Sequence, residues 1–93
     1  MPRPLTPGEI TLARAVFGDN IDYSDIKINN KKYWFGQPKD VGMSPNGNIY
    51  LPGNTHSEDF SKLDIKNQAF FIHEMTHVWQ YQKTGIHLGL QWS

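Results

Sequence analysis

The longest regular pattern in the sequence lies between Ile65 and Thr84. This stretch contains neither glycine nor proline, residues 61–64 before it offer capping side chains, and Gly85 stands where a helix commonly ends. Apolar residues recur within it at intervals of three and four, as on a helix that packs against a core. The pattern predicts a helix of about 20 residues, roughly 30 Å long at about 1.5 Å per residue.

A shorter helix is predicted near the N-terminus. Thr6 can cap it, Pro7 suits its first position, and Glu9 completes a capping box. The apolar positions that follow at helical spacing are Ile10, Ala13, Val16 and Phe17. Residues 18–20 read Gly-Asp-Asn and end the pattern, so we expect a short amphipathic helix.

Between the two helices the pattern changes to alternation and turns. Strand 26–28 alternates apolar and polar residues, and an Asn-Asn-Lys turn at 29–31 leads from it into a return strand at 33–35, which forms a first hairpin. A second hairpin is predicted at Asn46-Gly47, a strong two-residue turn, between strands 41–43 and 49–51. The sequence therefore predicts an α+β fold: a short N-terminal helix, a small antiparallel sheet of hairpins and a long helix.

Composition narrows the possible functions. The chain has 93 residues, enough for one domain and too few for two, so we predict a single domain over 1–93. Nine Lys and Arg balance nine Asp and Glu, which argues against a nucleic-acid partner bound by phosphate neutralisation. Cysteine is absent, which excludes disulfides and thiol nucleophiles. A metal site made of histidine or carboxylate is the remaining staple for so small a domain.

Hydropathy adds an expectation about location. No segment is apolar enough to form a transmembrane helix, and the first residues contain no apolar run typical of a signal peptide. We therefore expect no membrane contact and synthesis as a cytoplasmic protein.

Residues 73–77 read His-Glu-Met-Thr-His, an H-E-x-x-H motif inside the predicted long helix. Positions i and i+4 lie about 40° apart around a helix axis, so both imidazoles can bind one ion. Glu74 follows His73 by about 100° and can reach a water molecule held by that ion. In zinc hydrolases the ion lowers the pKa of water and the carboxylate takes the proton. The alternative is that His73 and His77 are ordinary polar residues on a solvated face.

The surroundings of the motif resemble a known family. Residues 71–80 are similar to the active-site helix of zincin-type metallopeptidases. More narrowly, the chain resembles the small zincin-like domains attached to type VI secretion spike (Vgr) and Rhs-type proteins of Gram-negative bacteria. Three further segments share this similarity: Leu5–Ile10, Pro45–Tyr50 and Glu58–Ser61. The resemblance covers most of the chain, although only the H-E-x-x-H motif is chemically specific.

This resemblance implies a site and a role. It implies His73 and His77 as Zn²⁺ ligands and Glu74 as the catalytic acid or base in hydrolysis of a peptide or protein substrate. It also implies an effector, or a domain associated with a secretion spike protein.

A catalytic zinc needs a third protein ligand, and the sequence leaves its identity open. Lys83 stands where the short zincin extension would place a histidine, and no Asp or Glu follows Glu74. His87 could fold back onto the ion from beyond the helix. The acidic and histidine side chains of the preceding loop are further candidates: His56, Glu58 and Asp59. A chain truncated at its C-terminus, or a ligand from another subunit, would also account for the gap.

Two classes of function therefore stay in competition. The first is a zinc-dependent metallopeptidase domain that uses Glu74 as general base. The second is a non-catalytic module in which the histidines hold zinc for stability, or a zincin remnant without metal. The lack of acidic residues after Glu74 favours the second class.

Overall fold

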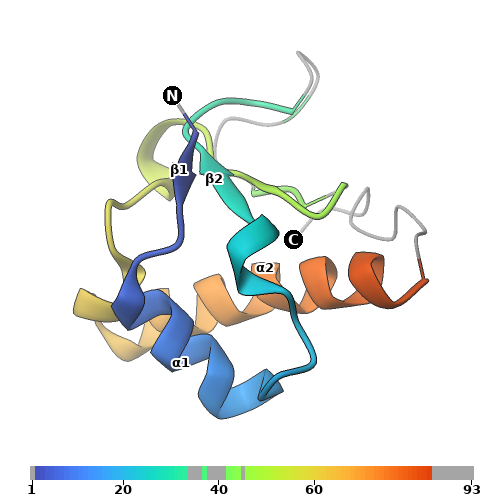
Figure 1. Ribbon diagram of the computed structural model, residues 1–93. Helices are drawn as coiled ribbons and strands as arrows, with labels where there is room; N and C mark the ends of the chain where they lie inside the picture. The colour runs from blue at the N-terminus through green and yellow to red at the C-terminus, as the bar shows by residue number, and fades with distance from the viewer. Residues whose placement is uncertain (1, 34–36, 38–41, 45, 85–93) are drawn as a thin grey trace.

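Two helices and a small sheet make up the computed structural model, which describes residues 2–33, 37, 42–44 and 46–84 (Figure 1). Figure 1 shows the strands above the helices, with the longer helix extending across the molecule. The predicted α+β class and the predicted bounds of the long helix are confirmed. The elements are β1 (Arg3–Pro4), α1 (Pro7–Phe17), β2 (Lys27–Asn29), β3 (Ile49–Tyr50) and α2 (Ile65–Thr84).

The start of α1 is fixed by the capping box that the sequence predicts. The Thr6 hydroxyl accepts a hydrogen bond from the Glu9 backbone N–H at 3.1 Å, and Glu9 Oε1 accepts one from the Thr6 N–H at 3.0 Å. These two bonds satisfy N–H groups that have no partner within the helix. Gly18 ends α1 with a φ of 60°, a conformation that favours glycine.

The start of α2 is fixed by Asp64. Its Oδ1 accepts hydrogen bonds from the Asn67 backbone N–H at 3.0 Å and from Asn67 Nδ2 at 2.7 Å. Both bonds lower the pKa of Asp64, and the bond from the Asn67 backbone has the larger effect. A short 3₁₀ turn, η3 (Phe60–Lys62), precedes this cap and contacts both helices.

The sheet is mixed and has the order β1-β2-β3. The β1 strand pairs antiparallel with β2, Arg3 opposite Ile28, whereas β2 pairs parallel with β3, Ile28 opposite Ile49. The prediction of an antiparallel sheet of hairpins was therefore wrong in this detail. The two partners of β2 come from distant parts of the chain, and one of them runs parallel to it. The Asn46-Gly47 hairpin is confirmed: Met43 and Tyr50 exchange backbone hydrogen bonds of 3.1 and 2.8 Å. The first hairpin's return strand, 33–35, lies largely outside the described residues.

The core lies between the sheet and the inner faces of the helices. Phe60 of η3 stacks on Phe71 of α2, with ring centroids 5.6 Å apart. The buried apolar residues include Leu5, Ala13, Ile26, Ile28, Ile49, Leu51, Phe60, Phe71, Met75 and Val78. Each large side chain in this set contributes roughly 1.5–3 kcal/mol to folding. This core holds α2 against β3 and fixes which face of α2 is buried.

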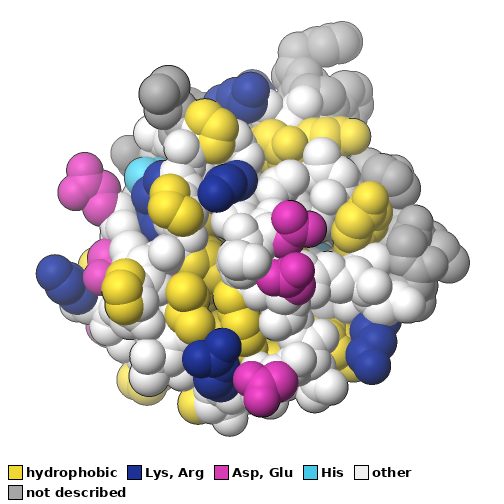
Figure 2. Space-filling model, viewed as in Figure 1, with side chains coloured by type: hydrophobic (Ala, Val, Ile, Leu, Met, Phe, Trp, Pro, Cys, Tyr) yellow, Lys and Arg dark blue, Asp and Glu magenta, His cyan; other side chains and the backbone are white. Residues whose placement is uncertain are grey.

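The surface is mixed in charge. Figure 2 shows cationic and anionic side chains interspersed on the viewed face, with apolar patches between them. This distribution agrees with the balanced count of charged residues. Among the described residues, no helix has the length and hydropathy needed to cross a membrane.

Candidate metal and catalytic site

The H-E-x-x-H motif lies in the second half of α2, and its side chains differ in exposure. Glu74 is fully buried, His77 is half-buried and His73 is exposed. The order follows from helix geometry, because the positions that face the core lie nearer to Glu74 than to His73 around the axis. The imidazoles therefore stand at the edge of the buried face of α2, with the carboxylate on its core side.

The two histidine rings lie beside each other. Their centroids are 5.0 Å apart and their planes are inclined at 88°. Two imidazoles that share one tetrahedral zinc ion, with Zn–N distances of about 2.0–2.1 Å, have ring centres about 5 Å apart. The separation of His73 and His77 therefore fits two ligands of a single ion.

The two oxygens of the Glu74 carboxylate differ in their hydrogen bonding within the described part of the chain. The Ser44 hydroxyl donates a hydrogen bond to Oε1 at 2.8 Å, and both groups are buried. Oε2 is buried and has no hydrogen-bond partner within the part of the chain that the structure describes. A buried polar atom without a partner costs roughly 1–3 kcal/mol. Such a cost points to a functional use of this oxygen.

No pattern in the sequence marks Ser44 or Gly42 as part of the site. The Asn46-Gly47 turn predicts the hairpin, but nothing in the local sequence indicates which turn of α2 the hairpin covers. A Cβ atom on Gly42 would lie 2.8 Å from Leu51 Cδ2 and 3.1 Å from Glu74 Oε2. Glycine at this position therefore allows the backbone to approach the carboxylate closely.

Replacing Gly42 with alanine is expected to destabilise the protein by about 1–3 kcal/mol, because the new methyl group overpacks the contact with Leu51 and Glu74. Urea unfolding followed by tryptophan fluorescence measures the change. Gly18→Ala serves as a comparison, because it tests backbone strain without overpacking. Its φ of +60° imposes strain on an alanine, but a Cβ there would meet no atom within 4 Å. A Gly42→Ala protein as stable as the wild type would contradict this description of the hairpin contact.

The tip of the same hairpin packs on the last turns of α2. Gly47 has a φ of +84°, and a Cβ there would lie 2.9 Å from Tyr81 Cδ2. Tyr81 is half-buried against this tip, one helical turn past His77. The hairpin therefore touches α2 at both Glu74 and Tyr81 and lines one side of the motif.

The structure supplies no third ligand among the residues it describes. No group of three His, Asp or Glu side chains is assembled there. The carboxylate of Asp59 accepts hydrogen bonds from the hydroxyls of Thr6 and Ser61. The pKa of Asp59 is lowered, and the bond from Ser61 is the largest cause. Burial, with a smaller effect of nearby Arg3, lowers the pKa of His56. His87 lies outside the described residues.

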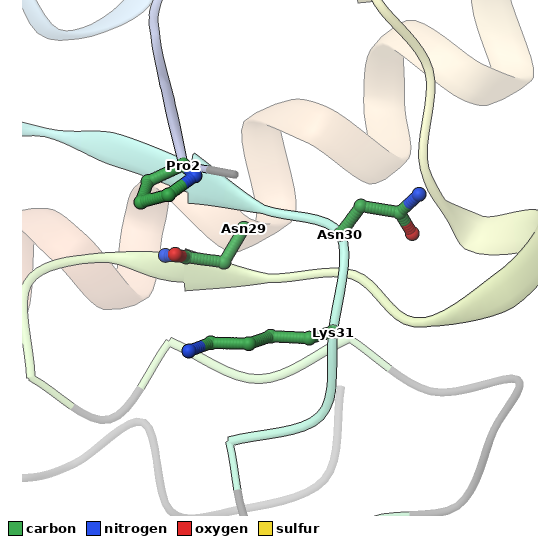
Figure 3. A pocket seen from close by; sticks show the side chains of 4 residues that line it. All are labelled: Pro2, Asn29, Asn30 and Lys31. Atoms are coloured by element: carbon green, nitrogen blue, oxygen red, sulfur yellow. The ribbon is translucent and has the colours of Figure 1, made fainter.

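A separate small pocket of about 210 Å³ opens beside the end of β2. It is lined by Pro2, Asn29, Asn30 and Lys31 (Figure 3). Figure 3 shows the Asn30 side chain pointing away from those of Asn29 and Lys31. Among the described lining residues, none belongs to the H-E-x-x-H motif and Lys31 alone carries a charged side chain.

Together, fold and site define an α+β domain whose long helix carries an H-E-x-x-H motif against a hairpin. No protein-family model matches the chain. The type VI secretion system spike protein VgrG2b of Pseudomonas aeruginosa is 48% identical over 81 residues, which are 86% of this chain and 8% of that protein. The solved effector domain of Pseudomonas aeruginosa VgrG2b matches with a TM-score of 0.89 at 45% identity, covering 97% of this chain and 50% of that chain.

These similarities establish a relationship. The chain is homologous to the VgrG2b effector domain and shares the fold of the part it matches. It spans half of the solved effector domain and less than a tenth of the whole spike protein.

Proposed function

We propose that the chain belongs to a zinc-dependent peptidase domain of a type VI secretion effector. The observation that carries the proposal is the environment of Glu74. Its carboxylate is fully buried, its Oε2 has no hydrogen-bond partner among the described residues, and it lies next to a histidine pair at the separation of shared ligands. The homology to a domain described as the effector domain of a spike protein supports the secretion context. A peptide or protein substrate, a spike protein as partner and delivery by the secretion apparatus are parts of the same proposal.

The chemistry divides between a metal and the chain. His73 and His77 would hold zinc, and a bound zinc ion supplies Lewis acidity, which lowers the pKa of water and polarises a carbonyl. Glu74 handles the proton: Oε2 accepts it from the attacking water and returns it to the amine released when the peptide bond breaks. Ser44 holds Oε1 during both transfers. His87, or a residue outside this chain, would complete the ligand set.

A metal analysis tests the site. Protein purified without a metal-affinity tag and incubated with zinc is expected to contain about one zinc per chain by plasma mass spectrometry. His77→Ala is expected to lose it, because one remaining imidazole from the pair cannot hold the ion tightly. The matched control is His56→Ala, which removes a histidine outside the motif and should leave the zinc content unchanged. A wild-type protein without zinc would overturn the proposed function.

A non-catalytic zinc module is the second candidate. It uses the same histidine pair at the separation of shared ligands, but it gives Glu74 no role in proton transfer. In such a module zinc binds and stabilises the fold, but no substrate is hydrolysed. The substitution of Glu74 argued in the Discussion separates the two candidates.

A further inference from the structure

The side chain of Gln80 contacts His77 of the H-E-x-x-H motif from one helical turn away. Gln80 Oε1 lies 3.2 Å from His77 Nδ1, and both side chains are half-buried. We infer that Gln80 is a positioning residue, which fixes the tautomer and the ring orientation of His77 for metal binding. This inference rests on the proposed zinc site.

The chemistry of the two groups sets the direction of the hydrogen bond. A neutral imidazole carries one N–H and one lone pair, and an amide oxygen can only accept. With Gln80 Oε1 as acceptor, Nδ1 of His77 donates the hydrogen, and Nε2 keeps the lone pair. A metal ion can bind only at the nitrogen with the free lone pair, so the bond to Gln80 prepares Nε2 as the ligand atom.

The same bond restricts the ring. A histidine anchored at Nδ1 cannot rotate freely about its side-chain bonds, so Nε2 of His77 has one preferred position. His73 is more exposed, and among the described residues its ring has a contact with His77 but no hydrogen bond. The pair is therefore asymmetric: His77 is held in place before metal arrives, and His73 adjusts to it. Partners of this kind change metal affinity by about 10- to 100-fold when they are removed.

Zinc affinity of the full chain, measured by competition with a chromophoric chelator, tests the inference. Gln80→Met keeps the length of the side chain but removes the acceptor, and it is expected to weaken zinc binding about 10- to 100-fold. Gln80→Glu restores an acceptor oxygen and should bind zinc at least as tightly as the wild type. The matched control is Gln82→Met, which removes a glutamine bonded to the Asp22 backbone instead, and its zinc affinity should not change.

A second readout needs no metal. Long-range ¹H–¹⁵N NMR of the zinc-free protein at pH 8 reports which ring nitrogen of each histidine carries the hydrogen. His77 should carry its proton on Nδ1 in the wild type and in Gln80→Glu, and populate the Nε2–H form in Gln80→Met. Unchanged zinc affinity in Gln80→Met, or an Nε2–H ring in the wild type, would overturn the inference while the zinc site stands. A wild type that binds no zinc would instead overturn the proposed function, and the inference with it.

Discussion

Replacement of Arg3 with methionine is expected to destabilise the protein by about 3 kcal/mol. The guanidinium of Arg3 forms a forked ion pair with Glu9, with both N–O distances at 2.9 Å, and also donates to the Ser57 carbonyl at 2.7 Å. Glu9 is fully buried, and removing one partner of a buried pair costs about 3–5 kcal/mol, because the other charge stays desolvated. The lower end applies here because Glu9 keeps hydrogen bonds from the N–H groups of Thr6 and Phe60.

Urea unfolding measures this loss, and the chain supplies its own control. Arg14 pairs with Asp19 at 3.4 Å on the surface, where both side chains are more than half exposed. Arg14→Met should therefore change the free energy of unfolding by less than about 1 kcal/mol. A domain of this size has roughly 5–14 kcal/mol in total, so a loss of 3 kcal/mol is readily resolved. Equal effects of the two substitutions would show that the Arg3–Glu9 pair does not hold the N-terminal strand to η3 and α1.

The local parts of this fold follow from the sequence. The capping box at Thr6 and Glu9 depends on residues three positions apart, and the bounds of α2 depend on its own composition. The Asn46-Gly47 turn likewise acts over a few residues. Each of these elements is decided by neighbours in sequence, and each was predicted with its position.

The pairing of strands that lie far apart in the chain does not follow from the sequence in this way. The β1 strand has two residues and includes Pro4, so no alternating pattern marks it. Its partner Ile28 also pairs with Ile49, and the apolar character of Ile28 suits either neighbour equally. Which segments meet is settled by the whole core, and that information is spread over the chain.

The candidate site also has one part that follows from local sequence and one part that does not. The positions of His73, Glu74 and His77 relative to one another follow from helix periodicity, so the motif alone predicts that the two rings meet. The Ser44 hydroxyl reaches Glu74 across 30 positions of sequence. Its contribution therefore depends on how the hairpin docks on α2, which no local pattern encodes.

Replacement of Glu74 with glutamine is expected to abolish hydrolysis and to stabilise the zinc-free protein. The loss of the general base should reduce cleavage of fluorescein-labelled casein by about 10²–10⁴-fold. The gain in stability is about 1 kcal/mol, or roughly 4–8 °C in Tm. It follows because Oε2, a buried carboxylate oxygen without a hydrogen-bond partner among the described residues, is replaced by an uncharged group. The Ser44 hydroxyl can still donate to the amide oxygen of glutamine.

The chain contains three glutamates, and the same substitution in each should give three different results. Glu9→Gln removes one acceptor from a buried carboxylate whose two oxygens are both bonded to Arg3, so it should destabilise. Glu58→Gln changes an exposed side chain and should alter neither stability nor cleavage. Glu74→Gln alone should combine higher Tm with lost cleavage, the pattern of a group kept for function at a cost in stability.

The outcomes also separate the two candidate functions. If the wild type binds zinc but does not cleave casein, and Glu74→Gln only raises the Tm, the non-catalytic module is favoured. If Glu74→Gln retains cleavage, Glu74 is not the base, and the proposed role of Oε2 is wrong. A fall in Tm on substitution would contradict the predicted gain: either Oε2 has a stabilising partner in solution, or the buried amide N–H groups of glutamine find no acceptor. A rise in Tm together with lost cleavage would therefore support the proposed role of Oε2 in proton transfer.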